Sequence, residues 1–434
     1  MKLEIEKLIY EGFGLGHDEN GRAIFVKKSV PGDTLDVEIV KEKKNYAEAK
    51  ITKIIRASEL RVNPKCPHFA LCGGCDFQGI AYADQLKFKE NYFKETLDRQ
   101  KVETQILPIL PSKSEYFYRS TIAFKFIETD GKISLAMYDY LDYRHLIPIE
   151  TCFLQSETAI NIMREVVAWA NEITESSNLE TLRLREGKRT GEYMVEIFTS
   201  AAQLEAKDEL KSRLIEITGI KSIYHCVVVD KKKGDVKRNL IFGSGAITEK
   251  IGKYTFTVSP QSFFQTNGTN VEVLYDLIKK FADVKIGDRV LDLFCGTGTI
   301  GIYLSTLAKE VIGIEVNQQA INDAKANIRI NKVLNAHFTQ ANIYDHQQLN
   351  NLAIEQFDLI VVDPPRAGLT HELIQQLSDF MDVKDFRLIY ISCDPATFAR
   401  DIKEFEKYGH QLKKVQPVDM FPQTYHLECV GLIQ

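Results

Sequence analysis

A cysteine ends an apolar, β-branched run in the stretch LIYISCDPATFARD, residues 388–401. The run is typical of a buried strand, and a helical segment, ATFARDIKEF, begins two or three residues after Cys393. The N–H groups at the start of a helix favour a thiolate, so this position predicts a lowered pKa for Cys393 and a role as a nucleophile. The alternative is a buried structural thiol, the commonest fate of a lone cysteine.

A second group of residues follows strands in a nucleotide-binding pattern. In DLFCGTGTIGIYLS, Gly296 and Gly298 let the backbone turn sharply beside a ligand, although the third glycine of G-x-G-x-x-G is absent. Glu315 ends the next strand, about 20 residues downstream, where a carboxylate accepts both ribose hydroxyls of NAD or S-adenosylmethionine. The alternative for Glu315 is an acid next to a helix N-cap. Asn342, just after the third strand, is a candidate for hydrogen bonding an adenine.

An acid also stands at a rigid corner in VVDPPRAGL. Asp363 precedes two prolines and must lie at the carboxyl end of its strand, where ligands of such sheets bind. A dehydrogenase has no obvious use for this acid. In several methyltransferase families, a [DN]-P-P corner lies between the methyl donor and a planar base, so a functional role is favoured over a structural turn.

Three cysteines cluster in CPHFALCGGC, with the spacing C-x5-C-x2-C. Together with a distant fourth cysteine, the set is Cys66, Cys72, Cys75 and Cys152. Four thiolates suit zinc or an iron–sulfur cluster. Zinc ribbons pair two C-x2-C knuckles, whereas one knuckle with two outlying cysteines is closer to cluster ligation. The remaining thiols, which we assign to packing, are Cys226, Cys295 and Cys429.

The elements that position these residues fall into three segments. Residues 1–58 alternate apolar and polar residues between turn sequences, which predicts four or five strands closing into a small OB-like barrel. Residues 59–255 hold the cysteine cluster, a helix at 81–100 and strand-like runs, so we expect an α+β domain. From 256 to 434, strands alternate with helices, which predicts a parallel, doubly wound, Rossmann-like α/β sheet. Two apolar runs in the tail predict a terminal hairpin on the sheet edge.

Composition limits the class of protein. The 434 residues favour two or three domains, and 44% hydrophobic with 26% charged residues is ordinary for a globular chain. The formal net charge of -5 gives no electrostatic argument for nucleic-acid binding, and the basic runs KEKKNYAEAK and DKKKGDVKRN are typical of solvated loops or hairpins. The chain has no run of about 18 apolar residues and no apolar signal core, so we expect a cytoplasmic protein.

Taken together, SCDPATFARD, DPPRAGL, DLFCGTGTIG, CPHFALCGGCDFQ and the terminal HLEC resemble the RNA uracil-carbon-5 methyltransferases of the RumA/TrmA type. The resemblance covers the whole chain and implies an RNA-binding TRAM barrel, a methyltransferase domain using S-adenosylmethionine, and a [4Fe-4S] cluster on the four cysteines. It implies that the Cys393 thiolate adds to carbon 6 of uracil and that Glu428 then removes the carbon-5 proton. The alternative for Glu428 is an ordinary acid on an edge strand.

The same resemblance assigns contacts to the methyl donor. The residues concerned are Gln265 in SFFQTN, Phe294, Glu315 and Asp363. Phe263 either stacks on the target base, which must be flipped out of folded RNA, or packs in the core. The cluster and the barrel favour 23S rRNA over tRNA as substrate. No step needs electrons, so we expect the cluster to organise the fold and the RNA surface. A single chain holding every catalytic part favours a monomer.

Two other classes of protein compete with this interpretation. An NAD-dependent iron–sulfur oxidoreductase explains the glycine loop and the cysteines but leaves Cys393, Asp363 and Glu428 without a role. A non-catalytic RNA-binding protein on a methyltransferase fold is disfavoured because the nucleophile and the base are both present.

Overall fold

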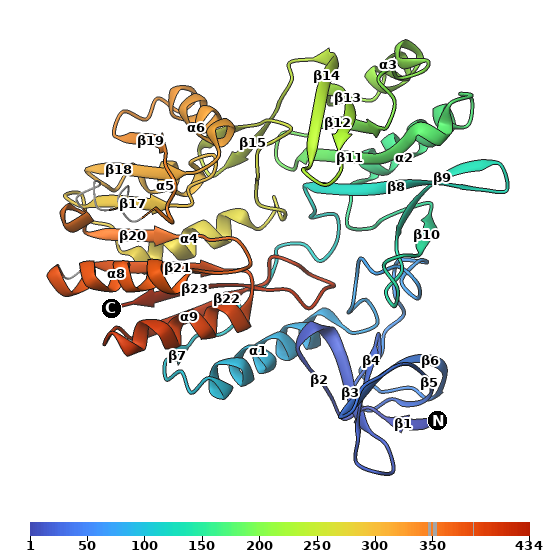
Figure 1. The fold of residues 1–434 in the computed structure, drawn as a ribbon, viewed down its shortest axis with the longest axis horizontal. Coiled ribbons are helices and arrows are strands. Elements are labelled where there is room, and N and C mark those ends of the chain that lie inside the picture. The colour runs from blue at the N-terminus through green and yellow to red at the C-terminus, as the bar shows by residue number, and fades with distance from the viewer. Residues whose placement is uncertain (346–348, 350–353, 385) are drawn as a thin grey trace.

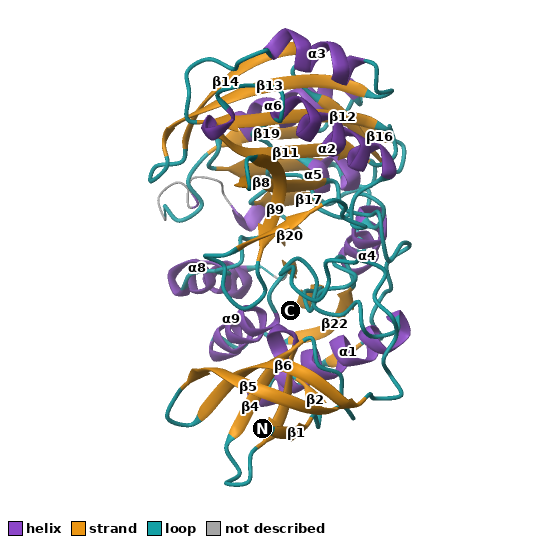
Figure 2. Ribbon diagram, turned by 90° about the vertical axis from the view of Figure 1, so that its right-hand side faces the viewer, coloured by secondary structure: helices purple, strands orange, loops and turns teal. Residues whose placement is uncertain are grey.

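The computed structural model describes residues 1–345, 349, 354–384 and 386–434. Within these ranges the strands form a six-stranded, a seven-stranded, a two-stranded and an eight-stranded sheet (Figures 1 and 2). Among the described helices, we find none with both the length and the apolar character that a membrane span requires.

The N-terminal sheet is a small barrel. Its strands are β1 (Lys2–Glu4), β2 (Lys7–Leu8), β3 (Phe13–His17), β4 (Ala23–Lys27), β5 (Thr34–Glu42) and β6 (Tyr46–Arg56), in the order β1-β5-β6-β4-β3-β2. β1 and β2 are two halves of one segment, and because β1 pairs with β5 while β2 pairs with β3, the sheet closes on itself. The predicted barrel is therefore confirmed, with six described strands instead of four or five.

The central sheet is mainly antiparallel and has the order β10-β9-β8-β11-β12-β13-β14. Its strands are β8 (Thr121–Thr129), β9 (Lys132–Tyr138), β10 (Leu146–Ile149), β11 (Leu179–Gly187), β12 (Glu192–Thr199), β13 (Ile220–Asp230) and β14 (Asp235–Gly243). Helices α2 (Glu157–Ala170) and α3 (Lys207–Ile215) share one hydrophobic core with this sheet, so together they form the predicted α+β unit. A short hairpin of β15 (Ile247–Ile251) and β16 (Tyr254–Val258) leads to the last segment.

The C-terminal sheet has the order β19-β18-β17-β20-β21-β23-β22-β7. Its strands are β17 (Arg289–Leu293), β18 (Glu310–Glu315), β19 (Ala336–Gln340), β20 (Leu359–Val362), β21 (Arg387–Ser392), β22 (Leu412–Val418), β23 (Glu428–Ile433) and β7 (Gln105–Ile106). Strands β17 to β21 are parallel, as predicted, and only β23 runs against its two neighbours. The carboxyl ends of the parallel strands therefore share one edge, where ligands of such sheets bind.

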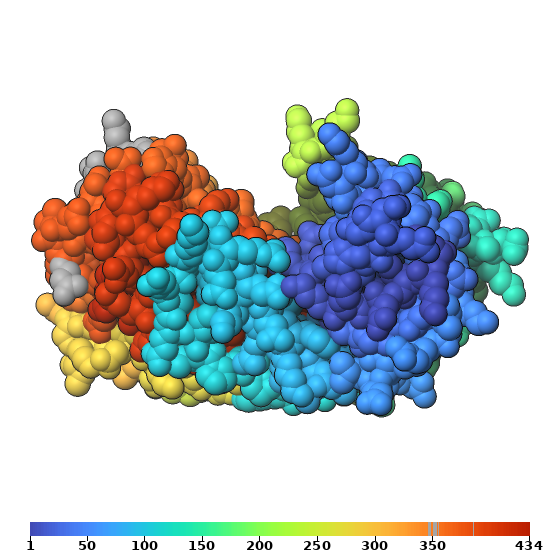
Figure 3. All heavy atoms as spheres, turned by 90° about the horizontal axis from the view of Figure 1, so that it is seen from below, coloured from blue at the N-terminus to red at the C-terminus, as the bar shows by residue number. Residues whose placement is uncertain are grey.

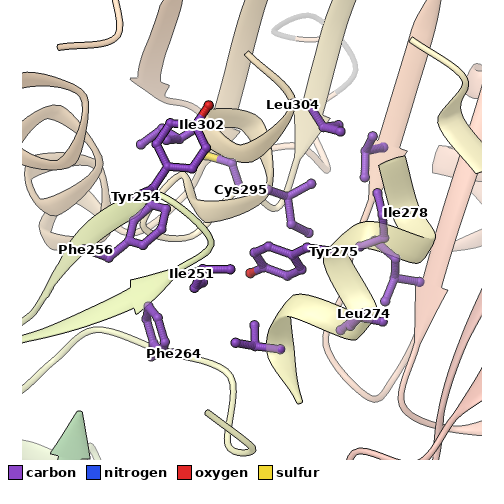
Figure 4. Close-up of a cluster of buried hydrophobic side chains, with 14 of the residues drawn as sticks. Ile251, Tyr254, Phe256, Phe264, Leu274, Tyr275, Ile278, Cys295, Ile302 and Leu304 are labelled. Atoms are coloured by element: carbon purple, nitrogen blue, oxygen red, sulfur yellow. The ribbon is translucent and has the colours of Figure 1, made fainter. Parts of the chain in front are cut away.

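Helices cover both faces of this sheet. One core holds side chains of α4 (Val271–Ala282), α5 (Thr299–Leu304) and α6 (Gln318–Ile330), and Figure 4 shows its aromatic and aliphatic contacts around Tyr275. The other core holds side chains of α8 (His371–Val383) and α9 (Pro395–Lys407). The apolar residues of each strand thus have a partner layer on either side, as a doubly wound sheet requires.

A helix from before the central sheet also packs on the C-terminal sheet. α1 (Tyr82–Arg99) contributes Phe93 and Leu97 to the core that contains Phe398 of α9, and β7 pairs in parallel with β22. The prediction of a terminal hairpin at the sheet edge is therefore wrong in one respect: β7 is the edge strand, and the hairpin of β22 and β23 lies next to it. Figure 3 shows α1, in cyan, lying between the red C-terminal lobe and the blue N-terminal lobe.

Candidate active site

Cys393 and Glu428 lie side by side at the end of the C-terminal sheet. β21 and β23 pair antiparallel, with Ser392 opposite Cys429. The next position in this register sets Cys393, just after β21, opposite Glu428, the first residue of β23. The electrostatic effect of the Glu428 carboxyl on the Cys393 thiol reflects the same proximity. The structure therefore brings together the two residues on which the predicted chemistry depends.

The pKa prediction for Cys393 is wrong in direction. Burial, with added repulsion from the Glu428 and Asp363 carboxyls, raises the pKa of the Cys393 thiol to about 12. The start of α9 does not reverse this effect, because the side chain of Asp394 already caps that helix by accepting the N–H of Thr397 at 2.8 Å. A carboxylate thus occupies the position from which the helix would have favoured a thiolate.

The positive charge of Arg366 opposes burial and the two carboxyls, because it lowers the pKa of the Cys393 thiol. Sequence reasoning missed this residue. Its guanidinium charge also lowers the pKa of Glu428. It bonds the ring of His426 at 3.1 Å, and burial with the arginine charge lowers the histidine pKa to about 3. The signal was its place in DPPR, directly after the corner that carries Asp363.

The two carboxyls beside the thiol are held out of water. Glu428 is buried, and within the described residues its Oε2 has no hydrogen-bond partner. Burial, followed by repulsion from Asp363, raises the pKa of Glu428 well above its usual value. Desolvation raises the pKa of Asp363 to about 7. A carboxyl with such a raised pKa can collect a proton near neutral pH, which is the property that a general base needs.

The glycine loop after β17 is shaped for close approach of a ligand. Phe294 has φ +61°, an uncommon conformation for a residue with a side chain, and such strain is concentrated at binding sites. Gly296 has φ +53° with open space where a Cβ would lie, whereas a Cβ on Gly298 would meet the ring of Phe338 at 2.7 Å. Glu315 accepts the N–H of Gly296 at 3.3 Å. The predicted ribose carboxylate and the loop are therefore in direct contact.

A further acid lies beneath this loop. Asp292 is buried at the end of β17, and burial raises its pKa to about 8. Its Oδ2 accepts the N–H of Gly301 at 2.9 Å, while its Oδ1 has no partner within the described ranges. Sequence reasoning did not single out this acid, because a polar residue in the run RVLDLF was taken as part of a strand. Asn342 is exposed after β19, and its Oδ1 accepts the N–H of Tyr344 at 3.1 Å.

The loop between β16 and α4 presents Phe263 to solvent. The Phe263 side chain is 70% exposed, so the core-packing alternative is wrong, whereas the next residue, Phe264, is only 8% exposed and packs in the core. Arg185 fixes the loop by donating to the carbonyls of Pro260 and Ser262 at 2.8 and 2.9 Å. An anchored loop therefore holds an exposed ring.

Gln265 lies in the same loop but is buried. The hydroxyl of Ser120 donates to the Gln265 carbonyl at 2.9 Å and to the Thr266 carbonyl at 2.8 Å. Ser120 immediately precedes β8, so the central sheet also fixes the backbone at Gln265.

The four cysteines of the predicted cluster line one cavity, although they come from two loops far apart in the sequence. Within the described residues, no group of three or more His, Cys, Asp or Glu side chains has the arrangement of a metal site. Two of the sulfurs accept hydrogen bonds, Cys72 from the Gly74 N–H at 3.4 Å and Cys75 from the Gln78 amide at 3.3 Å. Burial raises the pKa of each thiol, that of Cys152 to about 11.

The thiols assigned to packing are buried elsewhere. Cys226, on β13 of the central sheet, and Cys295 belong to the hydrophobic core that includes α4, and Cys429 belongs to the core that includes α9. Their burial is consistent with the packing role that the sequence predicted.

Comparison with known proteins decides the family. A family model described as tRNA (Uracil-5-)-methyltransferase matches residues 81–434, and the TRAM domain model matches residues 1–52. The chain belongs to this methyltransferase family. It is therefore an enzyme that transfers a methyl group from S-adenosylmethionine to carbon 5 of uracil in RNA, and the resemblance seen in the sequence motifs is confirmed. The NAD-dependent oxidoreductase alternative is wrong.

Similar proteins match over the full chain. An uncharacterized RNA methyltransferase of Clostridium tetani is 34% identical over 98% of this chain and 94% of its own length. An uncharacterized RNA methyltransferase of Halalkalibacterium halodurans is 34% identical over 100% of this chain and 96% of its own length. The crystal structure of the Pyrococcus abyssi tRNA (uracil-54, C5)-methyltransferase with S-adenosyl-L-homocysteine is 28% identical, with a TM-score of 0.79 over 100% of this chain and 99% of that one.

Proposed function

We propose that this enzyme methylates uridine through a transient bond between Cys393 and carbon 6 of the base. The thiolate adds to carbon 6 of uracil, and an electron pair is displaced onto carbon 5. Carbon 5 then takes the methyl group as the bond between methyl and the donor's sulfur breaks, and S-adenosylhomocysteine leaves. The Glu428 carboxylate takes the proton from carbon 5, the bond between sulfur and carbon 6 breaks, and the thiolate returns. The pairing that sets Cys393 beside Glu428 carries this proposal.

The protonation states of the site fit a reaction that begins only with substrate bound. The raised pKa of Cys393 keeps the free thiol protonated, which protects it from side reactions until it is needed. The positive charge of the Arg366 guanidinium lowers the pKa of this thiol and so stabilises its anion. Asp363, half-buried next to the pair, would lie between the methyl donor and the pyrimidine ring.

S-adenosylmethionine supplies the methyl group, and the loop after β17 fits its nucleoside part. Open space at Gly296 and the unpartnered Oδ1 of Asp292 are features that a bound ligand would complete. Glu315 would hold the ribose hydroxyls and Asn342 the adenine, while Phe294, Gln265 and Asp363 would line the rest of the donor site.

Phe263 would stack on RNA near the target base. An exposed aromatic ring on an anchored loop gains stacking energy without having to be ordered first. Because a thiolate must reach the face of the ring, the target uridine has to leave its own stack, and a protein ring nearby offsets part of that cost.

The four-cysteine cavity would hold a [4Fe-4S] cluster on Cys66, Cys72, Cys75 and Cys152. Support comes from the donor set and from the two N–H groups that already point at sulfur, an arrangement that tunes metal-bound thiolates. The cluster would supply the positive charge that keeps these buried thiols deprotonated. No step of methyl transfer runs through it, and its role would be to hold the fold and the RNA surface.

For the substrate, we propose 23S rRNA, with tRNA as the second candidate. The barrel and the cysteine cluster favour rRNA, as the sequence indicated. The tRNA candidate is favoured by the Pyrococcus abyssi enzyme, because it matches this chain from end to end, barrel included. The domains would be residues 1–58, 59–255 and 256–434, in a monomeric cytoplasmic protein.

The test is methyl transfer to both RNAs. Purified enzyme is incubated with methyl-labelled S-adenosylmethionine and either unmodified 23S rRNA or unmodified tRNA, and the digested nucleosides are separated. We expect label in 5-methyluridine from 23S rRNA alone. Label from tRNA alone would select the second candidate, and label in neither would overturn both substrate assignments. Mapping of 5-methyluridine in cells lacking the gene identifies the position.

A further inference from the structure

The segment that leads into Glu428 is a buried loop. Residues 419–427 connect β22 to β23, and Asp419, Met420 and Leu427 are fully buried in it. Connecting loops normally run over the surface, because their backbone polar groups need water. A buried loop must find protein partners for those groups instead. The identity of these partners therefore determines how firmly Glu428 is held.

Lys89 is a partner shared by the two ends of the loop. Its side chain, on α1, is completely buried, and its ammonium group donates three hydrogen bonds. They go to Asp419 Oδ1 at 2.7 Å, to the Phe421 carbonyl at 3.0 Å and to the His426 carbonyl at 2.8 Å. One cation thus ties the first residue of the loop to the residue two positions before Glu428.

The middle of the loop is held by other groups. The backbone N–H groups of Asp76 and Phe77, next to the cysteine cluster, donate to the Gln423 carbonyl at 2.8 and 3.0 Å. The Gln85 amide donates to Gln423 Oε1 at 3.0 Å, and the phenol of Tyr92 donates to the Tyr425 carbonyl. These bonds do not involve Lys89, so they can keep the loop folded when its ammonium group is removed.

The His426 end of the loop also leads to the nucleophile. The ring of His426 bonds Arg366, and the charge of Arg366 lowers the pKa of the Cys393 thiol. A shift at the His426 carbonyl would therefore move both the base and the arginine that stabilises the thiolate. Misplacement of reacting groups by about 1 Å can cost about 100-fold in rate.

We propose that Lys89 is a positioning residue that sets the geometry of Glu428 for proton removal, through the ends of loop 419–427. This inference rests on the proposed function, because it assumes that Glu428 is the base. Lys89 itself does not touch the reacting atoms. Its removal should slow the step that releases methylated RNA more than the step that forms the bond to sulfur.

The experiment measures covalent enzyme–RNA adduct on ordinary uridine RNA with S-adenosylmethionine, by denaturing gel. Glu428→Gln should trap the adduct, because the carbon-5 proton cannot leave. Lys89→Met should lower turnover about 10- to 100-fold and raise the trapped fraction at least fivefold over the wild-type enzyme. Leu97→Ala is the control, because Leu97 is buried on the same helix but has no side-chain group that can hydrogen-bond the loop. It should lower the unfolding temperature without trapping adduct.

The outcomes separate the two levels of the account. If Glu428→Gln traps the adduct but Lys89→Met traps no more adduct than the wild-type enzyme, the positioning role of Lys89 is overturned. No adduct with Glu428→Gln would overturn the proposed mechanism itself. If Lys89→Met does not fold, Lys89→Met combined with Asp419→Leu removes both buried charges, and such replacements are often tolerated. The double variant should trap adduct as well, since the His426 carbonyl still loses the hydrogen bond from Lys89.

Discussion

Tyr10, in the N-terminal barrel, donates a hydrogen bond from its phenol to the Asp394 carboxylate, which belongs to the residue directly after Cys393. Asp394 also caps α9 with its other oxygen, so a single carboxylate joins the barrel, the helix and the strand end that carries the thiol. The tyrosine ring packs edge-on against Tyr425, in the loop that precedes Glu428. The barrel is therefore in contact with both sides of the candidate active site.

Tyr10→Phe should loosen this contact without removing the ring. Hydrogen bonds to charged groups contribute about 1.5–3 kcal/mol, so we expect the free energy of unfolding to fall by about that amount. Turnover should fall several-fold while RNA affinity stays the same, because the exposed face of the barrel is unchanged. Denaturant unfolding and steady-state kinetics check both expectations. Lower RNA affinity with unchanged turnover would contradict this role.

Arg366 should set the pH dependence of the reaction. The reactive forms are the Cys393 thiolate and the Glu428 carboxylate, and both groups have raised pKa values, so each gains its active form as pH rises. We expect kcat/KM to increase with pH through the neutral range. Arg366→Met removes the charge that lowers both pKa values and should move the rising part of the profile to higher pH. An unchanged profile would show that the guanidinium does not act on either group.

Phe263→Ala and Phe264→Ala form a matched pair. The exposed Phe263 ring should contribute little to stability, but loss of one stacked base costs about 1–3 kcal/mol, or about 5- to 150-fold in kcat/KM. The buried Phe264 ring should instead cost about 3–5 kcal/mol of stability. Methylation assays and thermal unfolding of both variants test the contrast. Full activity of Phe263→Ala would remove Phe263 from the RNA site.

Metal analysis tests the cysteine cavity. Protein purified without oxygen should contain four iron and four sulfide per chain, by the definition of a [4Fe-4S] cluster. Cys75→Ser should lose the iron and unfold at a lower temperature, because the four thiols line one cavity. Cys226→Ser, a buried thiol outside that cavity, should keep its iron. Zinc in place of iron would correct the metal, and no metal would assign the thiols to packing.

Local patterns predicted the elements well but not their long-range partners. The alternation of strands and helices after residue 256 is a local signal, and the parallel order of β17 to β21 follows from it. The pairing of β21 with β23 is a long-range register that no local pattern specifies. Helical spacing likewise predicted α1, but not that it packs on α9 instead of the central sheet, nor that Lys89 on it is buried.

The error at Cys393 has the same origin. The start of a helix is visible in the sequence, and it predicted a lowered pKa. Burial raises the pKa most, and the two carboxyls that add to it, Glu428 and Asp363, come from two other strands. The charge that opposes them is on Arg366. The residue types and their positions at strand ends could therefore be predicted from the sequence. Their combined electrostatic effect on the Cys393 pKa could be seen only in the structure.

The most direct test of the account is the reaction with RNA that carries 5-fluorouridine at the target position. Fluorine cannot leave carbon 5 as a proton does, so the adduct should persist after one methyl transfer. With S-adenosylmethionine present, we expect one RNA per enzyme, attached to a peptide containing Cys393, and no adduct with Cys393→Ala. Attachment to another residue, or normal 5-methyluridine formation by Cys393→Ala on ordinary RNA, would contradict the account.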